Sequence, residues 1–107
     1  MSLRTVEVEI GGNPAICVEG IVDLSSVGDL SDALDRAIRN NVGSVVTVDL
    51  DAVPAIDDSA LGVLLGAAAT ARERSGDVEL VCNSESLRDR LSRTRLDRAI
   101  VVRSTIS

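Results

Sequence analysis

The feature that most constrains the fold is an alternation of strand-like apolar runs with segments of helical apolar spacing. One apolar run, Ser44–Leu50, lies between two helical patterns, from Val27 to Val42 and from about Asp58 to Arg74. A strand followed by a helix and a second strand forms a right-handed parallel crossover. The order predicts an α/β domain with a mixed, mostly parallel sheet of about five strands and helices packed on it.

The segments on either side complete this α/β pattern. Thr5–Ile10 alternates apolar and acidic residues, which predicts a strand with one solvent-exposed face. Gly11-Gly12-Asn13-Pro14 then predicts a hairpin into a more buried strand. Ser25 or Ser26 is the expected N-cap of the first helix, which should end at Asn40, Asn41 and Gly43. The other expected elements are strands at Ala15–Val18, Val78–Cys82 and Ala99–Val102 and a helix at Ser84–Arg95.

The second helix is apolar nearly all round, which predicts burial on more than one side. Gly62 and Gly66 each cost helix propensity of about 1 kcal/mol against Ala. Close approach of the helix to the sheet is the packing reason that we expect for them.

Composition removes several classes of function. The chain has no aromatic residue and no histidine, and its 11 basic residues are all arginine. Without His or Lys there is no Ser-His-Asp triad, no imidazole metal ligand and no Walker-type lysine. A net charge of −6 and the lack of stacking platforms argue against a nucleic-acid partner. Acidic residues concentrate before residue 61 and arginines after it, which predicts one acidic face; the later arginines are expected on a solvated helix face.

Length and cysteine usage indicate one reduced domain. The 107 residues fit a single domain, expected to span residues 1–107 with frayed ends. The longest apolar stretch, Ala60–Ala71, is shorter than a membrane span, so we expect a cytoplasmic protein with no direct membrane insertion. Cys17 and Cys82 form no C-x-x-C pair and are expected as free, small core residues.

Carboxylates gather at the junction between the central strand and the second helix. Asp49, Asp51, Asp57 and Asp58 precede Ser59 there, and the carboxyl ends of strands are where ligands bind in α/β sheets. On the residues alone, helix capping by Asp57 or Asp58 is the favoured explanation of the junction. A Mg²⁺-dependent phosphoryl-transfer site built on the four carboxylates is a further hypothesis. The absence of lysine and of a glycine-rich phosphate loop weighs against that enzyme.

Three motifs in order resemble the STAS domain family, in particular the bacterial anti-sigma factor antagonists. Val48-Asp49-Leu50 followed by Ile56-Asp57-Asp58-Ser59-Ala60-Leu61-Gly62 is similar to the family's apolar-Asp-Ser-Ser-Gly-Leu-Gly run. Glu19-Gly20-Ile21-Val22-Asp23 is similar to its Gly-x-Leu-Asp segment, and Leu91–Asp97 to its Leu-x-x-Thr-Gly-Leu-Asp ending. The resemblance covers nearly the whole chain.

The resemblance implies a bacterial regulator of transcription and stress responses that is not an enzyme. In the family, an anti-sigma factor with serine kinase activity phosphorylates the second motif hydroxyl, which is Ser59 here. The unmodified form binds the kinase and releases sigma factor, and phosphorylation breaks the complex. Asp23, Asp57, Asp58, Ser59 and Ala60 are the implied partner-binding residues. A phosphatase is a further partner, and no cofactor or metal is expected.

Two departures from the family motif bear on this implied switch. Asp58 replaces the first hydroxyl and resembles a fixed fractional phosphate, while Ala60 replaces the motif glycine where a partner would approach. Arg95, in place of glycine, is the lesser change. The alternative hypothesis is a constitutive STAS scaffold, a transporter or stress-complex subunit that phosphorylation does not switch.

Overall fold

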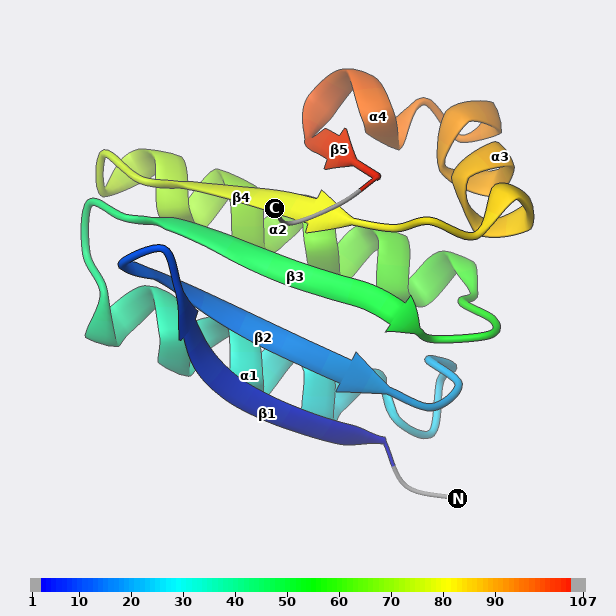
Figure 1. Cartoon of the computed structure of the whole chain (residues 1–107), viewed down its shortest axis with the longest axis horizontal. Helices are drawn as coiled ribbons and strands as arrows, with labels where there is room; N and C mark the ends of the chain where they lie inside the picture. The colour runs from blue at the N-terminus through cyan, green and yellow to red at the C-terminus, as the bar shows by residue number, and fades with distance from the viewer. Residues whose placement is uncertain (1–2, 105–107) are drawn as a thin grey trace.

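A computed structural model describes residues 3–104 and shows a five-stranded sheet with helices packed against one face (Figure 1). The strands follow chain order across the sheet, with β1 antiparallel to β2 and the other pairs parallel. The predicted mixed, mostly parallel sheet is confirmed. The expected fraying of the termini concerns residues outside the described range. The strands are β1 Arg4–Ile10, β2 Asn13–Glu19, β3 Val45–Ala52, β4 Asp77–Val81 and β5 Val101–Arg103.

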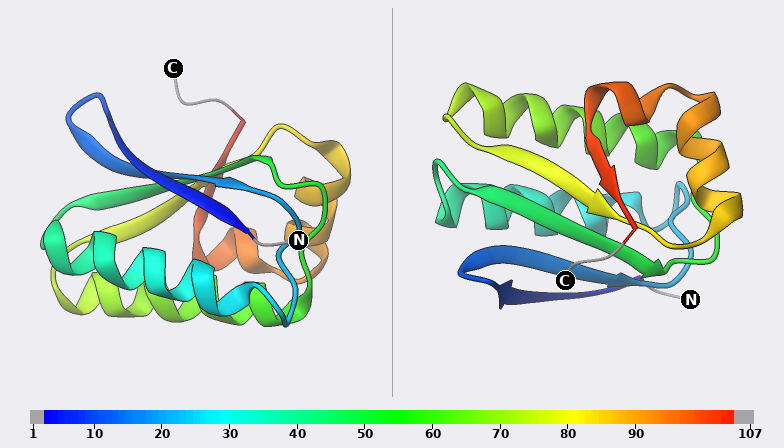
Figure 2. Two further views of the ribbon diagram at one scale, coloured as in Figure 1. Left: turned by 90° about the horizontal axis from the view of Figure 1, so that it is seen from below. Right: turned by 45° about the horizontal axis from the view of Figure 1, so that its top comes forward.

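The helices are α1 Val27–Asn40, α2 Asp58–Glu73, α3 Glu85–Arg93 and α4 Leu96–Ala99. In Figure 2 (left), α1 and α2 lie side by side under one face of the sheet, and the opposite face is bare of helices across residues 3–104. Within that same range, no helix has the length and apolar character needed to cross a membrane.

The core lies between the sheet and the α1–α2 pair, and apart from Cys82 its buried side chains are aliphatic. Every second residue of β2, β3 and β4 points into it, and the helices meet them with residues at helical spacing. Each fully buried Leu or Ile contributes roughly 1.5–3 kcal/mol by leaving water. The largest fully buried side chains are Ile16, Leu30, Leu34, Leu50, Leu64, Leu80, Leu91, Leu96 and Ile100.

The alternation in β1 is real, but its apolar side does not face the core. Val6 and Val8 lie on the open face of the sheet and remain 42% and 37% exposed. Cys17 pairs with Val6 on this face and is half-buried, whereas Cys82 is buried as predicted. An edge strand of alternating pattern shows that two faces differ, without showing which of them is covered.

Predictions for α1 and α2 need correction. Val42 lies beyond the end of α1 and is 63% exposed. α2 is buried along a single side, because its exposed side carries Gly62, Leu65 and Gly66. A Cβ added at either glycine would meet nothing within 4 Å, so the expected close approach to the sheet is wrong. The structure offers no packing reason for these two glycines.

The helix expected at Ser84–Arg95 breaks into α3 and α4 at Thr94-Arg95. Arg95 adopts a left-handed conformation with φ of 63°, and the Thr94 hydroxyl turns back to the carbonyl groups of Arg90 and Leu91. The family motif has glycine at this position, which suits a positive φ. The change to arginine, treated as minor, therefore falls at the hinge between the two helices.

Candidate functional site

The loop that leads into α2 is hydrogen-bonded along its length to the loop between β2 and α1. Val22 and Ile56 form an isolated parallel bridge, and the Val22 amide donates to the Ala55 carbonyl oxygen at 3.1 Å. The Asp57 amide in turn donates to the Val22 carbonyl oxygen at 3.0 Å. Both loops lie at the carboxyl end of the parallel strands, to the right in Figure 1. This pairing brings Asp23 beside the Asp57-Asp58-Ser59 junction.

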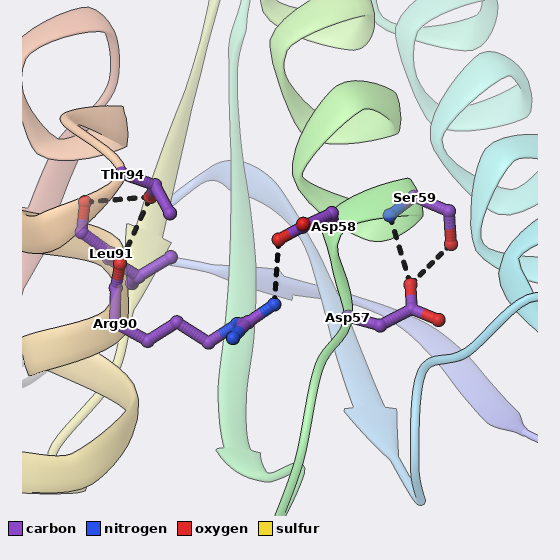
Figure 3. A network of polar contacts seen from close by, with 6 residues as sticks. All are labelled: Asp57, Asp58, Ser59, Arg90, Leu91 and Thr94. Carbon is purple, nitrogen blue, oxygen red and sulfur yellow. Dashed lines mark hydrogen bonds and ion pairs between the residues drawn. The ribbon is translucent and has the colours of Figure 1, made fainter.

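Asp57 is the N-cap of α2. Its Oδ1 accepts a hydrogen bond from the Ser59 amide at 3.0 Å and another from the Ser59 hydroxyl (Figure 3). The hydrogen bond from the Ser59 hydroxyl is the main cause that lowers the pKa of Asp57, while the nearby charge of Asp23 opposes it. The cap therefore carries a full negative charge at neutral pH, at the end of the helix where the dipole favours an anion.

Ser59 is a half-buried residue in the first turn of α2. Its Oγ lies at the positive end of the helix dipole, where the Ser59 amide is capped by Asp57 Oδ1 and the Ala60 amide donates to the Asp57 carbonyl oxygen at 3.1 Å. Ala60, which follows, is fully buried, so its methyl group lies in the core. The expected contact of Ala60 with a partner is thus not open to its side chain.

Asp58 and Ser59 point in opposite directions from the first turn of α2 (Figure 3). The Asp58 carboxylate forms an ion pair with Arg90 on α3, with 2.7 Å between Oδ1 and the guanidinium nitrogen. The Asp58 side chain is 88% exposed to solvent, whereas Arg90 is 40% exposed and its Nε is buried without a hydrogen-bond partner within residues 3–104. The charge of Asp58 is therefore partly neutralised and directed away from the Ser59 hydroxyl, unlike a second phosphate on the same side.

Asp23 organises the tight turn that enters α1. Its Oδ1 accepts hydrogen bonds from the Ser25 amide at 3.0 Å and the Ser25 hydroxyl at 2.7 Å. The Ser25 hydroxyl is the main cause that lowers the pKa of Asp23. Ser26 occupies the N-cap position without a side-chain capping bond; its buried hydroxyl instead accepts from the Asp23 amide and donates to the Ile21 carbonyl.

The two remaining carboxylates of the junction hold loops together. Asp49 Oδ1 accepts from the Asp51 amide at 2.9 Å. Asp51 accepts from both the backbone amide and the side-chain amide of Asn83, which follows β4. In the part of the chain that the structure describes, no group of three or more His, Cys, Asp or Glu side chains is arranged to hold a metal ion. The four carboxylates thus act separately and do not form the joint Mg²⁺ site of the enzyme hypothesis.

Comparison with models of known protein families assigns this domain to a family. A family model described as "Mlab, STAS domain" matches residues 6–103, nearly the whole described chain. The chain belongs to the STAS domain family. No curated protein sequence matches this STAS domain significantly.

Solved structures agree with this assignment. An anti-sigma factor antagonist from Mycobacterium paratuberculosis matches with a TM-score of 0.87 at 19% identity, covering 97% of this STAS domain and 87% of that chain. The anti-sigma factor antagonist SpoIIAA in its unphosphorylated form matches with a TM-score of 0.76 at 16% identity, over 94% and 89% of the two chains. The phosphorylated form of SpoIIAA from Bacillus matches with a TM-score of 0.68 at 16% identity, covering 94% of this STAS domain and 92% of that chain. At these identities the likeness shows the fold alone.

Arg90 is the residue of this STAS domain site that the sequence analysis missed. Its sequence position predicts only that it lies with the other late arginines on a solvated helix face. A carboxylate in place of the motif hydroxyl is a signal for a compensating cation, but Arg90 is one of five arginines between positions 88 and 98. Periodicity does not tell which of them reaches across 32 residues of sequence to Asp58.

Proposed function

We propose that this STAS domain is an anti-sigma factor antagonist whose binding to an anti-sigma factor with serine kinase activity is switched by phosphorylation of Ser59. The observation that carries the proposal is the placement of the Ser59 hydroxyl at the N-terminus of α2, hydrogen-bonded to Asp57, whose charge is in turn influenced by nearby Asp23. Family membership and the likeness of the fold to SpoIIAA support it. In this proposal the chain is a substrate and binding partner with no catalysis of its own.

Asp57 prepares the hydroxyl for phosphoryl transfer. Because it accepts the Ser59 hydrogen bond, a lone pair of Oγ is left to face an incoming phosphoryl group. Transfer forms a bond between Ser59 Oγ and the γ-phosphorus of ATP and breaks the bond between that phosphorus and the β–γ bridging oxygen. ADP leaves, and the hydroxyl proton is released. The lowered pKa of Asp57 makes it a weak base, so we assign it an orienting role and leave proton removal to the kinase.

The modified serine would change the charge and the hydrogen bonding of the site together. A phosphoserine carries about −1.5 to −2 charges at pH 7. It has no hydroxyl proton to give to Asp57, so the side-chain hydrogen bond becomes a repulsion, while the Ser59 amide still caps α2. The helix dipole offsets part of the new charge. We therefore expect a local electrostatic change at the partner surface, with the fold retained.

The test is to incubate the purified protein with the purified anti-sigma factor kinases of its genome and ATP, and to locate phosphate by mass spectrometry. One phosphate at Ser59, absent in Ser59→Ala, is the expected result. Ser59→Asp should lose binding to the nucleotide-loaded kinase roughly 100-fold, because its carboxylate would face the terminal phosphate of ATP and like charges forced together cost several kcal/mol. Ser92→Asp, which adds the same charge on an exposed part of α3, is the matched control and should bind as the wild type does.

A second candidate function is the constitutive scaffold, favoured by the carboxylate of Asp58 in place of the motif hydroxyl. It predicts a stable complex that neither Ser59→Ala nor Ser59→Asp alters.

In the switch proposal, a phosphatase acting on phosphoserine would restore the binding form, so phosphatase treatment of the modified protein should recover binding.

A further inference from the structure

The loop between β2 and α1 exposes two large apolar side chains next to the site. Leu24 is 80% exposed, the most of any large hydrophobic residue within residues 3–104, and Ile21 is 55% exposed. Val22, between Ile21 and Asp23, is fully buried. The backbone therefore turns one apolar side chain of the loop inward and leaves the other two in water.

The loop holds these side chains in a fixed position. Ser26 N donates to the Asp23 carbonyl oxygen at 3.1 Å, which closes a turn with Leu24 at its first central position. Within the same turn Asp23 accepts two hydrogen bonds from Ser25, and Ser26 Oγ bonds the Ile21 carbonyl oxygen at 2.9 Å. An apolar side chain on a rigid loop loses little conformational entropy on binding, so it is suited to anchor a partner.

Leu24 and Ile21 share one end of the molecule with the phosphoacceptor. The hydrogen bonds between Val22 and the β3–α2 loop fix the distance between the two loops. The polar groups around them are acidic: within residues 3–104, neither Asp23 nor Asp57 has an ion-pair partner, and hydrogen bonds lower the pKa of both. A surface that fits this end needs an apolar hollow with a basic rim.

We propose that Leu24 and Ile21 form an apolar anchor that inserts into a hollow rimmed by Arg or Lys on the anti-sigma factor kinase. This inference rests on the proposed function and names the chemistry of its partner surface. Phosphorylation of Ser59 and the anchor then act on one interface. The anchor and the basic rim around it supply affinity in the unmodified state, and the phosphate on Ser59 opposes docking because it would face the nucleotide phosphates that the kinase holds there.

Leu24→Ser tests the anchor, with Val42→Ser as the matched control. Val42 is 63% exposed after the C-terminal end of α1, at the opposite end of that helix from Leu24. By isothermal titration against the purified kinase, Leu24→Ser should weaken binding roughly 10- to 100-fold and Val42→Ser less than about 2-fold. Ile21→Ser should weaken binding by a smaller factor than Leu24→Ser, because less of its surface is exposed. Circular dichroism should show all three variants folded.

The outcomes separate the anchor from the switch. Wild-type affinity for Leu24→Ser, together with loss of binding by Ser59→Asp, would overturn the anchor and leave the proposed function in place. An affinity of the wild type that does not fall between 50 mM and 500 mM salt would overturn the basic rim. A wild-type protein that binds none of the purified kinases would overturn both proposals.

Discussion

The two sides of the first turn of α2 are held in different ways. Toward the β2–α1 loop, Asp57 and Ser59 belong to a set of hydrogen bonds that also fixes Asp23, and the negative charges there have no ion-pair partner within residues 3–104. Toward α3, Asp58 meets Arg90 in a single solvent-exposed ion pair. Neighbouring carboxylates in the sequence thus have distinct roles: Asp57 holds the Ser59 side of the turn and Asp58 links α2 to α3.

The largest expected difference in stability is between the two carboxylates themselves. Asp57→Ala removes the helix cap and the partner of the Ser59 hydroxyl, and should lower Tm by roughly 4–8 °C. Asp58→Ala removes only an exposed ion pair and should lower Tm by less than about 4 °C. Thermal unfolding followed by circular dichroism measures both, and equal shifts would contradict the division between the two sides.

A pH series isolates the charge of Asp57. Asp57→Asn keeps a capping oxygen and loses the charge, so the two proteins differ in a titrating group alone. The pKa of Asp57 is lowered below its ordinary value of 3.8 by the fold, so its ionised form adds stability above that pH. This contribution is lost as the pH falls through the lowered pKa. Denaturant unfolding should give the wild type a higher free energy of unfolding than Asp57→Asn at pH 7, and this difference should shrink below about pH 4. A difference that stays constant with pH would show that the charge of Asp57 does not stabilise the fold.

Replacing Arg95, which joins α3 to α4 in a left-handed conformation, by glycine should raise the free energy of unfolding of the protein. Arg95 has φ of 63°, a conformation that costs a non-glycine residue roughly 1 kcal/mol. Arg95→Gly should therefore raise the free energy of unfolding by up to about 1 kcal/mol in urea titrations. Ser75→Gly, at the other non-glycine residue of positive φ within residues 3–104, is a matched comparison in a turn far from α3. Destabilisation of Arg95→Gly alone would show that the arginine side chain has a structural role at the hinge.

The smallest effect belongs to the Asp58–Arg90 pair. A double-mutant cycle with Asp58→Ala and Arg90→Ala should give a coupling energy of about 0.2–1 kcal/mol, because both groups are exposed to solvent. It should fall further in 0.5 M salt. A coupling above about 2 kcal/mol would mean that this side of α2 is held as firmly as the Asp57 side.

The order of elements could be predicted because apolar periodicity in β2, β3, α1 and α2 reflects burial directly. The periodicity of β1 fixed its strand character, but Val6 and Val8 face the uncovered side of the sheet, which depends on where the helices pack. The exposed face of α2 was missed for a related reason. Small residues such as Gly62 and Ala69 count as apolar in a pattern although they cover little surface.

The parts of the site that depend on residues close together in the sequence could be predicted. Asp57 caps a helix within two residues of itself, and the motif around Ser59 marks the position that we propose as the phosphoacceptor. The Asp58–Arg90 pair depends on how α3 packs against α2, which no local pattern contains. The exposure of Leu24 likewise follows from the turn that Asp23, Ser25 and Ser26 close, and could not be read from its hydrophobicity.

The most direct test of the account is the affinity of the purified kinase for the wild-type protein before and after stoichiometric phosphorylation at Ser59, measured by isothermal titration. We predict that the unmodified protein binds and that the phosphorylated protein binds the nucleotide-loaded kinase roughly 100-fold more weakly, because about two negative charges are added opposite the phosphates of the bound nucleotide. Circular dichroism should show the same fold in both forms. Equal affinity of the two forms would contradict the switch and favour the constitutive scaffold.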